Sequence, residues 1–172
     1  ITDPTTAEMS KLTENAFRDS QIAFANEISM ICDEAGIKSH ELIALANKHP
    51  RVNILNPGSG VGGHCIPVDP LFLVSDFPDH SRFIRTARET NLLKTKWCIQ
   101  KIKKEINSFL KENKFPPKIS LMGLSYKPNS DDLRESPSEK ISSEIIKFSK
   151  GRVFISEPNL KKHSKFKLTN LK

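Results

Sequence analysis

Cysteine is scarce in this sequence, and its cysteines lack the spacing of a disulfide or metal scaffold. Cys32, Cys65 and Cys98 are the three in 172 residues, and an odd number without a CxxC pair argues against a disulfide framework and a zinc site. An apolar run of about 18 residues is also missing, which argues against a membrane-spanning helix. We expect no membrane partner. Because no signal peptide is recognisable either, we expect no metal and a location in a reducing cytoplasm.

Aromatic residues are also few, at 7% of the chain. The formal net charge of +7 favours anionic partners, such as nucleic acid, a membrane surface or a phosphorylated metabolite. Because few aromatics interleave with the lysines of segments 94–118 and 161–172, a nucleic-acid binder is a hypothesis that rests on charge alone. We expect no nucleic-acid partner, and salt-sensitive binding to duplex DNA would contradict this.

Periodicity and capping residues predict long helices in the first part of the chain. Asp3 and Pro4 are typical of an N-cap and a first helical position, and Gly36 is typical of a helix end. We expect a second helix over 39–48, capped by its first residue, serine, and a third, long helix over 81–113. The apolar residues that recur at helical spacing on the first helix are Phe17, Phe24, Ile28, Ile31 and Ala35.

A proline pair predicts the boundary between two domains. Pro116 and Pro117 break the long helical pattern. We therefore expect a helical domain over 1–115 and a smaller domain over 116–172.

The second part has the pattern of a single βαβ unit. Segments 118–124 and 152–156 read as strands. Between them, Ser136, Pro137 and Glu139 combine an N-cap, a proline in the first turn and a capping-box acid. We expect the two strands to be parallel, with a polar, lysine-rich tail after them.

The loop GVGGHCIPVDP, residues 60–70, is the strongest candidate for chemistry. Its glycines let the backbone turn sharply and let a ligand approach, which suits Cys65 as a nucleophile. Asp69 follows four residues later. His64 lies beside the cysteine; its chemistry assigns it no role, and a hydrogen-bonding loop residue is favoured over a general base.

A dinucleotide fingerprint in the same region is a false match. Gly58, Gly60 and Gly63 satisfy G-x-G-x-x-G, but the fingerprint needs a strand before the glycines and a helix that begins at the last one. Pro57 precedes the run and Pro67 follows it closely. We therefore expect no NAD site at these glycines.

Three separated motifs resemble the UDP-glucose/GDP-mannose dehydrogenase family. They are the cysteine loop at residues 60–70, AEMSKLTENAFRDSQIAFANE at 7–27 and SYKPNSDDLRESP at 125–137. The GGHC form and HPRVNI at 49–54 are most similar to the branch that oxidises UDP-N-acetyl-D-mannosamine, with UDP-N-acetylglucosamine 6-dehydrogenases close behind.

This resemblance implies a fold and a reaction. The fold is a mainly α central dimerisation domain with long helices, followed by a partial α/β, Rossmann-like domain that binds the UDP-sugar. The reaction oxidises C6 of the sugar to the uronate in two NAD-dependent steps through a cysteine thioester, for surface polysaccharide biosynthesis. The resemblance further implies a homodimer and a fragment that lacks the N-terminal NAD-binding domain and the end of the C-terminal domain. We expect such a fragment to be inactive alone; a dimerisation module without activity is an alternative.

The resemblance also assigns roles to individual residues. Cys65 matches the nucleophile, Lys11 and Asn15 match the pair that stabilises the oxyanion, and Asp69 matches the carboxylate that handles protons and activates water. Arg134 matches a contact to the nicotinamide cofactor. The positions that match substrate-binding residues are Arg18, His49, Arg51, Gly62, Tyr126 and Lys127.

Overall fold

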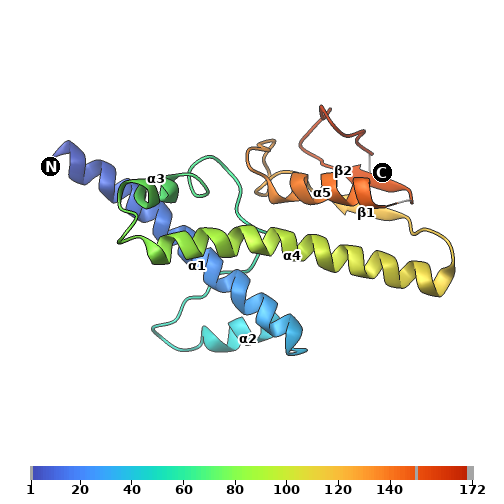
Figure 1. Ribbon diagram of the computed structural model, residues 1–172, viewed down its shortest axis with the longest axis horizontal. Helices are drawn as coiled ribbons and strands as arrows, with labels where there is room; N and C mark the ends of the chain where they lie inside the picture. The colour runs from blue at the N-terminus through green and yellow to red at the C-terminus, as the bar shows by residue number, and fades with distance from the viewer. Residues whose placement is uncertain (1, 150, 170–172) are drawn as a thin grey trace. The chain divides into compact units, whose positions relative to one another are not determined.

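The computed structural model describes residues 2–149 and 151–169 (Figure 1). They fall into two compact units, which divide between Lys94 and Thr95. The helical first part and the small α/β second part confirm the predicted fold class, while the predicted domain ranges 1–115 and 116–172 stay a prediction. The elements, in chain order, are α1 (Pro4–Glu34), α2 (Ser39–Ala46), α3 (Asp69–Asp76), α4 (Arg82–Asn113), β1 (Ile119–Met122), α5 (Pro137–Phe148) and β2 (Val153–Ser156).

Helix α1 begins and ends where the sequence predicts. The Asp3 carboxylate accepts hydrogen bonds from the Thr6 amide at 3.0 Å and from the Thr6 hydroxyl at 2.7 Å, which caps the first turn. At the other end Gly36 has a φ of +68°, and the Ile37 amide donates to the Cys32 carbonyl at 2.8 Å. This is a Schellman ending, which favours glycine because a left-handed backbone strains other residues.

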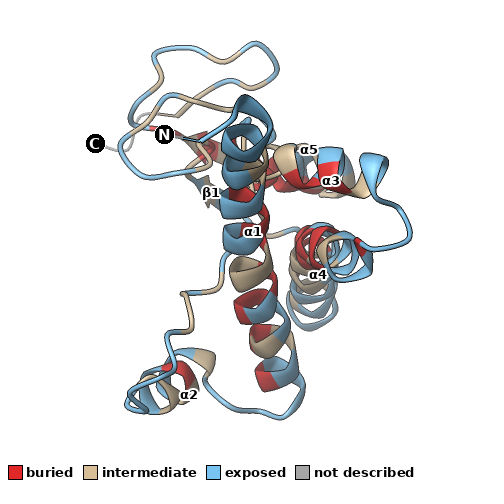
Figure 2. Ribbon diagram, turned by 90° about the vertical axis from the view of Figure 1, so that its left-hand side faces the viewer, coloured by how far each residue is buried: buried red, intermediate tan, exposed pale blue. Residues whose placement is uncertain are grey.

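Helix α1 buries a polar face and exposes its apolar stripe. Phe17, Phe24 and Ile31 are 62%, 51% and 57% exposed, and several of the residues two positions away from them, on the opposite face of a helix, are buried (Figure 2). The stripe therefore lies on the surface of the first unit. The buried residues of α1 are Asn15, Ala16, Asp19, Ala23, Ala25, Asn26, Ser29 and Cys32.

The short helices differ from the prediction. Ser39 was expected to cap α2, but Lys38 is the N-cap residue and makes no side-chain cap hydrogen bond. Helix α3 is not among the helices that the sequence predicts, because the cysteine loop is expected to extend to Pro70. Pro70 instead lies in the first turn of α3, where proline is tolerated because the amides of that turn have no partner within the helix.

The second unit is the predicted βαβ unit with an apolar core. Strands β1 and β2 are parallel, and α5 is capped by Ser136, whose hydroxyl accepts from the Glu139 amide at 3.4 Å. The tail returns to this sheet through a single bridge between Ile155 and Leu168. The core residues, contributed by α4 and α5, are Ile99, Ile106, Ile141 and Ile145.

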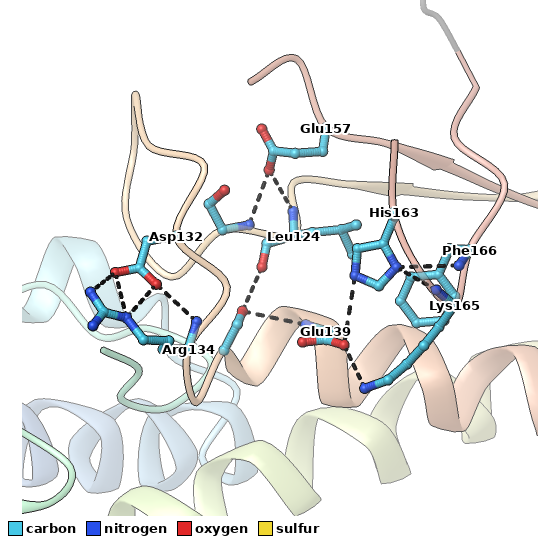
Figure 3. A network of polar contacts seen from close by, with 10 residues as sticks. Leu124, Asp132, Arg134, Glu139, Glu157, His163, Lys165 and Phe166 are labelled. Atoms are coloured by element: carbon cyan, nitrogen blue, oxygen red, sulfur yellow. Dashed lines mark hydrogen bonds and ion pairs between the residues drawn. The ribbon is translucent and has the colours of Figure 1, made fainter. Parts of the chain in front are cut away.

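Glu157 ties the end of β2 to the turn after β1 (Figure 3). One carboxylate oxygen, Oε2, accepts from the Leu124 amide at 2.8 Å and the Ser125 amide at 3.0 Å. The other, Oε1, accepts from the Asn159 amide at 3.0 Å. Burial opposes ionisation, but these backbone hydrogen bonds outweigh it and lower the pKa of Glu157 to about 2.

Replacing Glu157 with glutamine should remove acid-sensitive stability from the second unit. The folded pKa of about 2 lies below the ordinary glutamate value of 4.5, so the carboxylate stabilises the fold above about pH 4.5 and loses this effect as the pH falls toward 2. Its full contribution at neutral pH is about 3 kcal/mol. Urea unfolding followed by the fluorescence of Trp97, the one tryptophan in the chain, should show a lower and flatter pH profile for Glu157→Gln.

Glu144→Gln provides the matched control for this variant. Glu144 lies on α5 at the surface and pairs with Lys147 at 3.1 Å, an arrangement that contributes little to stability. Equal effects of the two substitutions between pH 2 and 7 would contradict the role of the Glu157 hydrogen bonds.

Candidate active site

Cys65 lies at the start of a turn that leads directly into α3. Its carbonyl oxygen accepts hydrogen bonds from the amides of Val68 at 3.1 Å and Asp69 at 2.8 Å. The preceding backbone reaches positive φ at Gly60 (139°) and Gly63 (96°), which a residue with a side chain rarely adopts. Cys65 itself is half-buried, so its thiol is held in a defined loop and is accessible to a small reactant.

Helix α1 brings the predicted Asn15 and Asp69 together across 54 residues of sequence. The Asn15 Nδ2 amide donates to Asp69 Oδ2 at 2.6 Å, and Asn15 is only 2% exposed. A hydrogen bond to a carboxylate is short and strong, so it fixes the first residue of α3 against α1. The result is a carboxylate on the same turn as Cys65.

Lys11 and Arg18 place cations on the exposed side of α1. Lys11 precedes Asn15 by one helical turn, and its Nζ pairs with Glu14 Oε2 at 3.1 Å, with both side chains more than half exposed. Arg18 is exposed as well. An exposed pair of this kind is weak, so the Lys11 ammonium can exchange Glu14 for a bound oxyanion at little cost.

His49 and Arg51 lie on a separate loop after α2. Asn47 closes this loop, because its carboxamide accepts from the Ile54 amide at 2.7 Å and donates to the Ile54 carbonyl at 3.0 Å. Within it, the Arg51 amide donates to His49 Nδ1 at 3.2 Å, and both side chains are exposed. Gly62 is half-buried in the cysteine loop.

The remaining candidates lie in the second unit, on the loop between β1 and α5. The ammonium of Lys127 is 5.6 Å from the centre of the Tyr126 ring. Arg134 forms a two-pronged ion pair with Asp132, with its Nε 2.9 Å from Oδ1 and an Nη 2.6 Å from Oδ2 (Figure 3). Asp132, which sequence analysis did not single out, therefore sets the direction of the Arg134 guanidinium.

The described residues do not provide a pyrophosphate site of the dinucleotide type. The glycine run follows α2 and a loop, and the next helix, α3, begins only at Asp69. The Gly58 amide is already bound to the side chain of Asn26. The glycine run therefore does not fit NAD. The described part of the chain also contains no group of three or more His, Cys, Asp or Glu side chains placed to bind a metal ion. None of the described helices has the length and apolar character needed to span a membrane.

Comparison with family models decides the relationship that the motifs suggest. Residues 5–92 match the central domain of the UDP-glucose/GDP-mannose dehydrogenase family, and residues 120–172 match its UDP-binding domain. The chain belongs to this dehydrogenase family. The candidate residues from Lys11 to Asp69 fall in the first match and those from Tyr126 to Arg134 fall in the second.

Individual relatives of the family are similar over nearly the whole chain. An NDP-N-acetyl-D-galactosaminuronic acid dehydrogenase from Ralstonia nicotianae is 55% identical over 161 residues, which cover 94% of this chain and 37% of the relative. The UDP-N-acetyl-D-mannosamine dehydrogenase from Escherichia coli K12 is 52% identical, covering 99% and 41%. The solved UDP-N-acetyl-mannosamine dehydrogenase from S. aureus has a TM-score of 0.81 at 41% identity, covering 93% of this chain and 37% of that chain. The chain thus spans about two-fifths of the length of these relatives.

Sequence analysis missed a buried polar network in the first unit. Asp19 and Asn26 on α1 are hydrogen-bonded to Arg88 and Asn91 on α4. One local signal was available: Asn15 and Asn26 are eleven residues apart, about three helical turns, and so share a face of α1.

Proposed function

We propose that this chain is the part of a nucleotide-sugar 6-dehydrogenase that carries the reactive cysteine and the UDP-sugar-binding residues. The observation that carries the proposal is the 2.6 Å hydrogen bond from Asn15 to Asp69, on the turn that begins at Cys65. It supports a site in which a thiol, a carboxamide and a carboxylate act together. The match of residues 120–172 to a UDP-binding domain supports a UDP-sugar as substrate.

The proposed substrate is UDP-N-acetyl-D-mannosamine, oxidised at C6 to the uronate for surface polysaccharide biosynthesis. Relatives more than 50% identical are named for this sugar nucleotide or for an N-acetylgalactosaminuronic acid. Both names describe N-acetylated sugars, which supports an acetamido sugar here. UDP-N-acetylglucosamine is the alternative substrate.

The chemistry proposed for this chain centres on Cys65. Its thiolate adds to the C6 aldehyde, and after oxidation of the adduct the resulting thioester is hydrolysed by water. Lys11 and Asn15 stabilise the oxyanion that forms at each of these steps, because fixed donors meet the charge as it develops. Asp69 accepts the proton of the attacking water. NAD accepts hydride in the family reaction, and its main site is proposed outside the residues described.

Substrate binding is proposed to use basic residues of the chain. Arginine suits a diphosphate because its guanidinium donates two parallel hydrogen bonds. Arg134 is proposed to face the nicotinamide cofactor, held in place by Asp132. The substrate-binding residues proposed are Arg18, His49, Arg51, Gly62, Tyr126 and Lys127.

A homodimer is the second part of the proposal. The exposed stripe of Phe17, Phe24 and Ile31 on α1 supports it, because three large apolar side chains on one helix face favour burial against another protein surface. A dimerisation module without activity remains the alternative function that this stripe favours.

The proposed role of Cys65 predicts protection by a substrate aldehyde. The C6 aldehyde of UDP-N-acetyl-D-mannosamine should slow alkylation of Cys65 by iodoacetamide at least fivefold, as measured by peptide mass spectrometry, because the thiol is consumed in the adduct. Cys98, which lies on α4 in the second unit, is the internal control. The chain alone with NAD and the UDP-sugar should produce no NADH. Equal alkylation of Cys65 with and without the aldehyde would contradict the proposal.

A further inference from the structure

The cysteine loop is attached to α1 at both of its ends. At its far end Asn15 donates to Asp69 at 2.6 Å. Two residues before its near end, the Gly58 amide donates to Asn26 Oδ1 at 2.8 Å. Because Asn15 and Asn26 share a face of α1, roughly 16 Å apart along the helix axis, one rigid element holds both ends of the loop that carries Cys65.

The carboxamide of Asn26 is held in one orientation by Asn91. Asn26 Nδ2 donates to Asn91 Oδ1 at 2.8 Å, which leaves its oxygen facing Gly58. Asn91 Nδ2 in turn donates to Asp19, to the carboxylate at 2.8 Å and to the carbonyl at 3.0 Å. Reversing the Asn26 carboxamide would set its NH2 group against the Gly58 amide and its oxygen against Asn91 Oδ1. The network therefore selects a single orientation of this carboxamide.

The hydrogen-bond network around Asn26 is buried in the first unit. Asn26 and Asp19 are fully buried and Asn91 is 1% exposed. Polar groups in such surroundings keep their hydrogen-bond partners, because water cannot replace them. The loop itself contains Gly60 and Gly63 at positive φ and has little stiffness of its own. The position of Cys65 therefore depends on where the ends of the loop are held.

We propose that Asn26, oriented by Asn91, is a positioning residue for Cys65. It fixes the start of the cysteine loop on α1, as Asn15 fixes its end. The catalytic meaning of this anchor rests on the proposed function of Cys65, whereas the anchor itself is a property of the loop and is testable without any sugar nucleotide.

The rates at which iodoacetamide alkylates the three cysteines of the intact chain test whether Asn26 holds the cysteine loop. In Asn26→Ala, the freed loop should expose Cys65 and raise its alkylation rate at least fivefold. Asn91→Ala, which removes only the group that orients Asn26, should have a smaller effect in the same direction. Cys32, which is 2% exposed, reports unfolding and should keep its rate within twofold.

Ser29→Ala is the matched control for Asn26→Ala. Ser29 lies one turn further on the same face, is 8% exposed, and bonds to the Asn26 carbonyl at 2.6 Å and to the Lys94 ammonium at 2.7 Å. It tests another buried polar link between α1 and α4, one that does not bond to the loop. Equal Cys65 rates in Asn26→Ala and Ser29→Ala would overturn the proposal.

A spectroscopic measurement on the unmodified chain covers the case in which Asn26→Ala fails to fold. The Gly58 nitrogen and the Asn26 side-chain carbon should show a scalar coupling across the hydrogen bond, and the Gly58 amide should exchange slowly with solvent. Absence of the coupling together with fast exchange would overturn the proposal. If the substrate aldehyde failed to block Cys65 while these signals were present, the proposed function would fail and the anchor would stand.

Discussion

Replacing Arg88 with methionine should lower the unfolding free energy of the first unit by about 3–5 kcal/mol at pH 7. Arg88 is 5% exposed, and its Nη1 lies 2.6 Å from Asp19 Oδ1. Asp19 is fully buried, and its second oxygen, Oδ2, has no hydrogen-bond partner among the described residues. Removal of the cation leaves a buried carboxylate without a positive charge beside it, which is among the costliest single changes in a protein interior.

The loss of unfolding free energy caused by Arg88→Met should depend on pH. Burial raises the pKa of Asp19 to about 6, against the lowering effects of Arg88 and Asn91. Because the folded pKa lies above the ordinary aspartate value of 3.8, the folded chain binds the proton more tightly, and the contribution of Asp19 to stability falls as the pH rises from about 4 to 6. The penalty for losing Arg88 should therefore be largest above pH 6 and small near pH 4, where Asp19 is neutral.

Urea unfolding followed by circular dichroism at pH 4 and pH 7.5 measures this dependence. The alkylation rate of buried Cys32 reports the unfolding of the first unit separately. The control is the double variant Asp19→Asn, Arg88→Met, in which neither position of the former ion pair carries a charge and most of the lost stability should return. An equal penalty for Arg88→Met at pH 4 and pH 7.5 would show that the cation does not act through the Asp19 carboxylate.

Replacing Phe24 with aspartate should weaken self-association of the chain roughly 100-fold or more. Phe24 is 51% exposed at the middle of the stripe, seven residues from both Phe17 and Ile31. In the proposed homodimer each substitution removes two buried phenylalanines, one from each copy, at about 1.5–3 kcal/mol each. The sum of about 3–6 kcal/mol corresponds to a 10²–10⁴-fold change in the dissociation constant.

Analytical ultracentrifugation over a range of concentrations measures the association. Leu45→Asp is the matched control, because Leu45 is 67% exposed on α2 and is not part of the stripe, and its replacement should leave the dimer intact. If Phe24→Asp and the unmodified chain showed the same dependence on concentration, the stripe would not be the dimer surface.

Much of the fold follows from short-range patterns in the sequence. The limits of α1 depend on Asp3 and Gly36, and the start of α5 depends on Ser136, each acting on backbone groups within a few residues. The three separated motifs at residues 7–27, 60–70 and 125–137 were sufficient to predict the family, since their order and residue types are specific. Helix α3 was missed because Asp69 and Pro70 also fit the exit of a loop, and only packing against α1 selects the helix.

The partners of the polar residues depend on the folded chain. Asn15 meets Asp69 across 54 residues and Arg88 meets Asp19 across 69, and no local pattern specifies such distant pairs. The same holds for the two faces of α1. Apolar periodicity marks Phe17, Phe24 and Ile31 as one stripe, but the face that becomes buried is the one whose side chains find hydrogen-bond partners on α3 and α4. Hydrogen bonds are directional and need both groups in place, so the cysteine loop receives its anchors only when these helices have packed.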